Sequence, residues 1–364
     1  MDSLTQITLG SAIGVAVMGR RTAVWKAALW GGVAGTLPDL DAFIDHGDAI
    51  LNMTRHRAES HSLLLLTLAS PLLAWAVSRM DGEVVGLQRR AAPSGNSIPS
   101  GGSALHGGTP QAPTFFWWWL ALWLVLFTHP LLDTMTIYGT QLLQPFTDHP
   151  FGVGSIFIID PLYTLPLIGG VVAALRLKSA RGLRCNLAGL ALSTFYLAWS
   201  FGAQQHATQV ARASLAEQNI NAQGLLVTPS PFNTVLWRLV ATTPTQYFEG
   251  HYSLFDNSQR ITWTAHDRGA ELIEQHRSEP SVARMAAFTH GFYSLSETDG
   301  RLFVTDLRMG QEPAYNFRFD LGNTPARVSG QHLPTQQSMR PDLGTALPWL
   351  WQRMWGNDVP LPRM

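Results

Sequence analysis

The chain has 364 residues, 25 basic and 25 acidic side chains, and therefore a net charge of zero. Neutrality excludes the basic footprint on which nucleic-acid binding depends, so no nucleic-acid partner is expected. The single cysteine, Cys185, excludes an internal disulfide framework. The length leaves room for two domains of ordinary size.

The two halves of the chain differ in polarity. Long apolar runs fill residues 1–203, whereas the remainder is polar and mixed. We therefore predict a polytopic α-helical membrane domain of about six apolar helices at 1–203, a connecting helix or linker at 204–221, and a β-rich soluble domain with an irregular tail at 222–364. The six apolar segments are Leu4–Gly19, Thr22–Leu37, Ser62–Val77, Phe115–Leu132, Ser155–Leu175 and Leu187–Phe201.

The first two segments are short compared with the ~20 residues that a spanning helix usually needs. Each contains two glycines four residues apart, Gly10 and Gly14 in the first and Gly31 and Gly35 in the second. This spacing favours close packing against a neighbouring helix. The two segments either cross the membrane obliquely or form a tight hairpin.

A stretch rich in Gly, Ser and Pro at residues 81–114 predicts a flexible linker. Basic residues occur in alternate loops between the apolar segments, which the positive-inside rule assigns to the cytoplasm. The N-terminus and the β-rich half are then expected outside the cytoplasm, in a multi-pass protein of the bacterial inner membrane. The residues in these loops are Arg20, Arg21, Lys26, Arg79, Arg89, Arg90, Arg176, Lys178, Arg181 and Arg184.

The second half contains short runs of aromatic and branched residues separated by turn signals such as Asp299-Gly300. This pattern is typical of antiparallel strands. The expected strands are Thr234–Val240, Gln246–Ser253, Arg260–Ala265, Phe288–Leu295, Arg301–Asp306 and Ala314–Leu321. A short helix is expected around Trp349–Trp355.

Six carboxylate and imidazole residues lie where apolar segments meet the outer membrane face. Carboxylates and imidazoles ligate divalent metals, so their clustering indicates a metal site at the membrane surface. Taken pairwise, the first four also fit a solvated turn at a helix end and a capped helix start. The six residues are Asp39, Asp41, His56, His61, His129 and Asp133.

His129 and Asp133 are the most informative pair. Their four-residue spacing puts both on one face of a helix, in a run that is otherwise almost wholly apolar. Ionisable groups inside a span cost several kcal/mol unless they pair, ligate or face water. A simple His–Asp hydrogen bond is the alternative to a metal site.

Four further residues have two interpretations each. Arg57 either clamps an anionic oxygen of a substrate or pairs structurally, and Glu59 is either a general base or an exposed carboxylate. Asp160 precedes Pro161, which is typical of a helix N-cap, although a role near the metal is the alternative. His149 either lines the site or lies in a solvated loop.

Several short motifs resemble those of the YdjM-type family of inner-membrane-associated proteins, which are described as metal-dependent hydrolases. The similarity covers the apolar half closely. The motifs are the opening Met-Asp-Ser-Leu-Thr-Gln, Leu37-Pro-Asp-Leu-Asp41, His56-Arg-x-x-Ser-His-Ser62, His129-Pro-Leu-Leu-Asp133 and Gly139-Thr-Gln-Leu-Leu-x-Pro-Phe-x-Asp148.

The resemblance implies a site similar to that of zinc-dependent phospholipase C, with one to three ions, most simply zinc. It carries the ligand role to Asp39, Asp41, His56, His61, His129 and Asp133. Many relatives have His where Gln6 stands here, which removes one ligand from this chain. The resemblance also implies a possible regulatory protein partner.

We predict a membrane-embedded hydrolase that acts through metal-activated water on an ester or phosphoester of a membrane lipid or lipid-linked substrate. The catalytic residues are expected to be Asp39, His61, Asp133 and Arg57. A membrane-anchored binding or regulatory protein with a structural metal is the alternative. A chain that ends near residue 215 is expected to insert and to bind metal, because every predicted ligand precedes residue 134.

Overall fold

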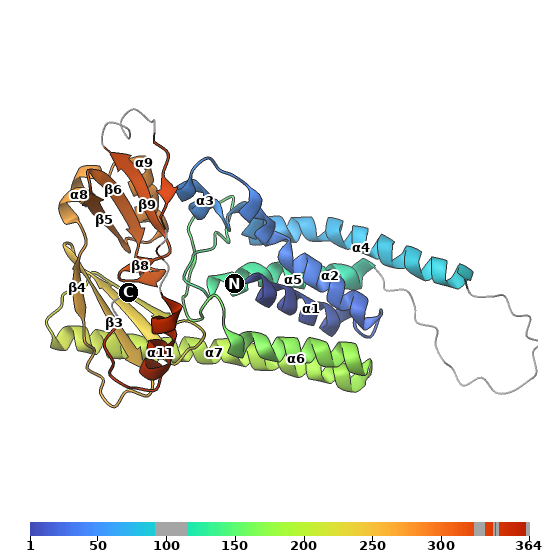
Figure 1. Ribbon diagram of the computed structural model, residues 1–364. Coiled ribbons are helices and arrows are strands. Elements are labelled where there is room, and N and C mark those ends of the chain that lie inside the picture. The colour runs from blue at the N-terminus through green and yellow to red at the C-terminus, as the bar shows by residue number, and fades with distance from the viewer. Residues whose placement is uncertain (92–114, 324–331, 338, 340–341, 362–364) are drawn as a thin grey trace, which may run out of the picture.

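The computed structural model describes residues 1–91, 115–323, 332–337, 339 and 342–361. Figure 1 shows a bundle of helices with a region of strands and short helices at one end of it. The elements of the helical region are α1 (Ser3–Met18), α2 (Val24–Thr36), the 3-10 helix η1 (Pro38–Phe43), α3 (Ala49–Arg55), the 3-10 helix η2 (Glu59–His61), α4 (Leu63–Ala91), α5 (Phe115–Thr134), α6 (Pro161–Leu177) and α7 (Ala180–Glu217).

Helices α1 and α2 form a hairpin in which the two backbones touch. A Cβ atom added to Gly10 would lie 2.3 Å from the carbonyl oxygen of Gly31, and one added to Gly31 would lie 2.2 Å from that of Gly10. Any larger residue at either position would push the helices apart. The sequence left two alternatives open, an oblique crossing of the membrane and a tight hairpin. The close approach at these glycines favours the hairpin.

The expectation of about six spanning helices is wrong for the part of the chain that the structure describes. Two helical segments there are long and apolar enough to cross a membrane, Leu63–Asp81 in α4 and Phe115–Thr134 in α5. The physical reason is length. At 1.5 Å per residue, α1, α2 and α6 reach only about 20–26 Å, short of the ~30 Å hydrocarbon core. In α7, polar and charged residues bound the apolar stretch on both sides.

The short apolar helices nevertheless share one core with α4 and α5. Side chains from α1, α2, α4, α5 and α6 pack together, with Trp118 and Leu167 among the most deeply buried. The outward face of α4 is different, because Leu68 and Leu72 are 64% and 74% exposed. The bundle thus has an apolar interior and an apolar exterior, the distribution that lipid surroundings favour.

The predicted Gly/Ser/Pro-rich linker begins later than expected. Helix α4 continues to Ala91, so residues 81–91 are helical rather than part of a linker. The rest of that stretch, residues 92–114, lies outside the described residues. Helix α5 then begins at Phe115, directly before the tryptophans at 117–119.

The strand region contains two antiparallel four-stranded sheets with the orders β1-β2-β3-β4 and β10-β9-β6-β5, and a β7-β8 pair. Helices α8 (Ala270–His276) and α9 (Pro280–Phe288) connect the sheets, and α11 (Leu343–Met354) follows them. The strands are β1 (Gly224–Pro229), β2 (Leu236–Thr242), β3 (Gln246–Ser253), β4 (Thr264–Asp267), β5 (Tyr293–Thr298), β6 (Arg301–Asp306), β7 (Gly310–Gln311), β8 (Ala314–Tyr315), β9 (Arg318–Asn323) and β10 (Thr335–Gln336).

The predicted strands agree unevenly with these elements. β3 and β6 have the predicted bounds, whereas the run predicted at 288–295 contains the end of α9 and only the start of β5. β1, α8 and α9 were not expected. α9 was not predicted because it has only nine residues, so its buried stripe of Val282, Met285 and Phe288 is shorter than the window of about 11–18 residues in which a helical period is recognised.

Two apolar cores join the helical region to the sheets. The end of α7 places Ala207, Val210 and Ala211 against Trp237 and Leu239 of β2, in the first core. Helix α7 runs unbroken across residue 203, the point where the sequence changes polarity. The sheet region is therefore packed on a helix that belongs partly to the bundle.

The second core includes residues from loops of the helical region. Ile50 and Met53 of α3, together with Tyr138, pack against Phe288 of α9 and strands β5, β6 and β9. The hydroxyl of Tyr138 donates a hydrogen bond to the carbonyl of Met53 at 2.7 Å. The loops that carry the predicted site are thus held between the bundle and the sheets.

Candidate metal centre

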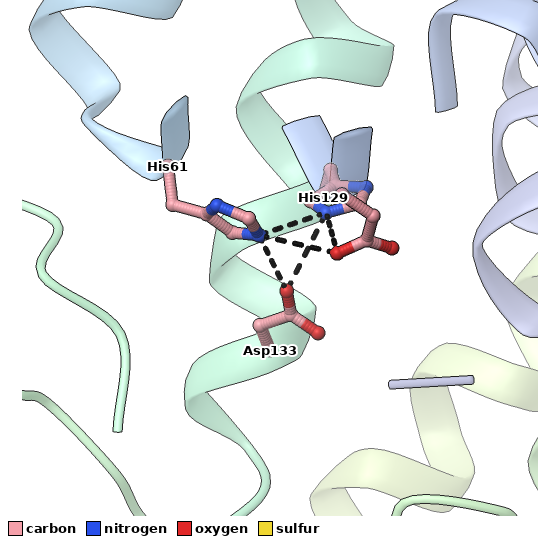
Figure 2. Close-up of side chains that lie close together, drawn as sticks. His61, His129 and Asp133 are labelled. Carbon is pink, nitrogen blue, oxygen red and sulfur yellow. Dashed lines mark hydrogen bonds and ion pairs between the residues drawn. The ribbon is translucent and has the colours of Figure 1, made fainter. Parts of the chain in front are cut away.

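Four of the six predicted ligands meet where the bundle adjoins the sheets. Asp39 lies in η1, directly after α2, and His61 ends η2, directly before α4. His129 and Asp133 lie one turn apart in the last turns of α5, on the same helix face. One ligand atom from each residue lies within 4.8 Å of every other. Figure 2 shows His61, His129 and Asp133 pointing toward one another.

The distances in this cluster are nearly uniform. The Nε2 atoms of His61 and His129 are 3.2 Å apart. Oδ2 of Asp133 lies 3.1 Å from the first nitrogen and 3.4 Å from the second. Oδ1 of Asp39 lies 3.4 Å and 3.5 Å from the same two nitrogens. The cluster is covered except at Asp39, whose side chain is 19% exposed, so solvent approaches from that side.

The hydrogen bonds of the two histidines determine which nitrogen is free. Nδ1 of His129 donates to the carbonyl oxygen of Gly35 at 2.8 Å. Nδ1 of His61 lies 2.8 Å from Oγ of Ser60, which itself donates to Asp41 at 2.5 Å. In both neutral rings Nε2 therefore carries the lone pair. Two lone pairs that face each other at 3.2 Å repel unless a cation lies between them.

The residues fit a divalent metal on three grounds. Bonds of about 2.0–2.1 Å to zinc imply donor separations of ~3.3 Å in a tetrahedron, close to the five measured distances. Oδ2 of Asp133 is buried and has no hydrogen-bond partner in the described part of the chain. The donor set of two imidazoles and two carboxylates suits zinc and similar divalent ions.

Asp41 and His56, which were also expected as ligands, lie outside this cluster and bind each other. Nδ1 of His56 is 2.8 Å from Oδ1 of Asp41. Oδ2 of Asp41 accepts the backbone N–H of Arg57 and the hydroxyl of Ser60. Burial raises the pKa of Asp41, but hydrogen bonds from His56 and Ser60 outweigh it, so the pKa lies below its usual range. Asp41 remains a carboxylate that orients the ligand His61 through Ser60.

Asp133 has a second set of neighbours on its other oxygen. Nε2 of Gln6 donates to Oδ1 at 3.1 Å, the guanidinium of Arg57 lies 3.5 Å away, and the amino group of Met1 also contacts it. Arg57 is buried and lies over the ring of Tyr138, with 4.9 Å between the guanidinium carbon and the ring centroid. One oxygen thus faces positive and amide groups while the other faces the histidines.

The remaining candidates lie elsewhere. Glu59 is exposed. Asp160 accepts hydrogen bonds from the backbone N–H groups of Leu162 and Tyr163, which confirms the predicted N-cap of α6. The ring of His149 packs against that of His290, with 4.9 Å between centroids and 46° between planes, and His149 is not one of the four clustered residues.

Three contributors to the site could not be recognised as such from the sequence. A serine just before a helix is usual as a cap, so Ser60 gives no sign in the sequence that its hydroxyl connects His61 to Asp41. The carbonyl of Gly35 fixes His129, and a backbone group leaves no sequence signal beyond the glycine itself. Gln6 was noted only as a departure from the family pattern, and its amide contacts Asp133.

We expect Asp41→Asn to weaken metal binding without abolishing it. The substitution removes the charge that holds Ser60 and His61, and losses of such orienting groups typically cost about 10–100-fold in metal affinity. Titration of the metal-free protein against a chelating indicator measures the effect. Glu59→Gln, an exposed neighbour, is the matched control and should leave the affinity unchanged. Equal affinities in the two variants would mean that Asp41 does not orient His61.

Comparisons with known proteins identify a family for this chain. No curated protein and no solved structure matches the chain. Residues 1–207 match the family described as YdjM inner membrane protein. The matched range covers more than half of the 364 residues and includes all four residues of the cluster. The chain therefore belongs to the YdjM inner membrane protein family.

Proposed function

We propose that this membrane protein is a metal-dependent hydrolase that acts on an ester or phosphoester of a membrane lipid or lipid-linked substrate. The observation that carries the proposal is the convergence of two imidazole Nε2 atoms and two carboxylates within 4.8 Å at the end of two apolar helices. His61, His129 and Asp133 would hold a divalent ion there, most simply zinc, which would supply hydroxide near neutral pH because a bound ion lowers the pKa of water to ~7.

The roles of the residues follow from their positions. His61, His129 and Asp133 are buried, and we assign them to holding the ion. Asp39 lies on the exposed side of the cluster, so it is placed to receive a proton from the attacking water, while the three buried residues would leave a fourth position on the ion open to that water. Arg57 is only 3% exposed and lies beside Asp133, which favours charge balance over a grip on the substrate. The catalytic role expected for Arg57 from the sequence is therefore not part of this proposal.

The loops around the cluster favour an apolar substrate. Phe43, at the end of the 3-10 helix that carries Asp39, is 87% exposed. Phe146 is 81% exposed, in a loop fixed by a hydrogen bond from Ser62 to the carbonyl of Gln144. Exposed aromatic side chains beside a membrane-level site suit contact with lipid chains. A lipid or lipid-linked ester is the substrate class that such surroundings admit.

The alternative, an anchored regulatory protein with a structural metal, has one observation in its favour. Four protein donors are enough to close a tetrahedral shell around one ion. Against it, structural zinc sites are typically built from cysteine thiolates, and this site has none. The same alternative would make the sheet region the surface that binds a regulatory partner protein.

Hydrolysis of reconstituted lipid tests the proposal. The full chain in neutral phospholipid vesicles is stripped with a chelator and then reloaded with zinc. We expect release of fatty acid or of the phosphorylated headgroup to stop after chelation and to return with zinc; which product appears identifies the bond. One zinc per chain without release of either product would support the structural alternative instead.

The site lies at one end of the α4–α5 pair, and we propose that this end faces outward. His61 precedes α4, and His129 and Asp133 are near the end of α5, while Arg79 belongs to the opposite end. The positive-inside rule puts the opposite end in the cytoplasm. Reporter fusions after residue 90 should be cytoplasmic, and those after residue 220 should be outside. A cytoplasmic signal at 220 would reverse the assignment.

A further inference from the structure

Helix α11 carries an exposed apolar stripe along its length. Leu343, Leu347, Trp351 and the C-cap residue Trp355 follow one another at intervals of four, and each is between 46% and 64% exposed. Residues four apart lie on one face of a helix. The opposite face is buried, and it includes Trp349.

Phe255 extends this stripe onto the sheet region. Its ring stacks on that of Trp355 with 5.2 Å between centroids and 7° between planes, and it is 51% exposed. We call these five residues, Leu343, Leu347, Trp351, Trp355 and Phe255, the α11 stripe.

The helix is fixed in place with the stripe facing outward. The guanidinium of Arg353 pairs with Asp256 at 2.5 Å and donates to the carbonyl of His251 at 3.0 Å. The hydroxyl of Ser253 donates to the carbonyl of Met354 at 2.5 Å. Arg353 is the one formally charged side chain among residues 343–354, and this pairing neutralises it. The α11 stripe is therefore a firmly held, uncharged surface rather than a loose tail.

The apolar surface continues from the stripe onto α7. Leu254, the neighbour of Phe255, lines a groove together with Phe195, Trp199 and other α7 residues. Phe195 and Trp199 are 72% and 50% exposed. Both belong to the segment that matches the inner membrane family.

We propose that the α11 stripe lies in the interfacial layer of the bilayer that holds α4 and α5, and so anchors the sheet region to the membrane surface. A neutral, tryptophan-rich helix face suits the boundary between headgroups and acyl chains. The continuity with exposed aromatic residues of α7 favours lipid over a second protein. The proposal does not depend on hydrolysis at the metal centre.

Spin labels test this position in the full chain reconstituted in phosphatidylcholine vesicles. Cys185 is the only cysteine, so Cys185→Ser provides a background free of thiols. Labels are attached to Leu347→Cys and Trp351→Cys, and a control label to Glu274→Cys, an exposed position on α8. Collisions with oxygen and with a water-soluble nickel chelate report depth. We expect the stripe labels about 5–10 Å below the headgroups and the control label in water.

Two results would overturn the proposal. Nickel accessibility at positions 347 and 351 equal to that at 274 would mean that the stripe faces water. Exclusion of both oxygen and nickel would mean that another protein, such as a second copy, covers the stripe. Because a substitution of Trp351 alters the stripe itself, Leu343→Cys gives an independent reading at its exposed beginning.

Discussion

Replacing His129 by Ala is expected to remove the bound metal while leaving the chain inserted in the membrane. The substitution deletes one of four donor atoms from a cluster in which each histidine Nε2 lies 3.1–3.5 Å from the other donors. Alanine is well tolerated within an apolar helix. The carbonyl of Gly35 loses its donor, which costs about 1–3 kcal/mol, less than a typical total stability. Metal per mole of purified protein, measured by atomic spectrometry, should fall from one ion toward zero.

His149→Ala is the matched control for this prediction, because His149 lies in a loop outside the cluster. The control should retain the metal. Full metal content in His129→Ala would mean that His129 and Asp133 form a structural hydrogen bond and that the ion, if any, lies elsewhere. Asp133→Ala is a poorer test, because it also leaves Arg57 buried without its carboxylate, which can cost about 3–5 kcal/mol by itself.

The four-residue spacing of His129 and Asp133 and the Asp-Leu-Asp turn were enough to locate the neighbourhood of the site from the sequence. They were not enough to distinguish ligands from the residues that orient them. Asp39 and Asp41 are equivalent in the sequence, but only Asp39 reaches the cluster, because the 3-10 turn of η1 points the two side chains in different directions. Which of the two carboxylates reaches the metal site depends on the backbone dihedral angles of the 3-10 turn, and the identity of the side chains does not specify these angles.

The predicted number of spanning helices was wrong for a different reason. The runs Leu4–Gly19, Thr22–Leu37 and Leu187–Phe201 have only 15 or 16 residues, and the longer run Ser155–Leu175 is helical only from Pro161, so none of them gives an apolar helix as long as a bilayer is thick. Close packing of glycine pairs stabilises short helices inside a bundle. The packing of Ile50, Met53 and Tyr138 into the sheet core was also beyond prediction, because it joins residues that are more than a hundred positions apart. Sequence patterns show which side chains of a helix or strand are buried, but not which distant residues they pack against.

This packing reverses the expectation for a chain that ends near residue 215. Such a chain retains all four ligands of the cluster but loses α9, β5, β6 and β9, against which Ile50, Met53 and Tyr138 pack. It also exposes the end of α7, including Val210 and Ala211. We now expect the shortened chain to bind metal weakly, because the loops that hold Asp39 and His61 lose their support.

Two full-length variants test whether the sheets hold the metal centre in place or only stabilise the fold. Phe288 contacts the ring of Tyr138, with 5.9 Å between centroids, and Tyr138 in turn lies under Arg57 beside Asp133. Trp237 is buried in the other sheet core. Phe288→Ala and Trp237→Ala should each cost about 3–5 kcal/mol of stability. Only Phe288→Ala should lower metal affinity in protein that remains folded, as measured by chelator competition. Equal affinities would mean that the sheets stabilise the chain without supporting the metal centre, and the shortened chain should then bind metal normally.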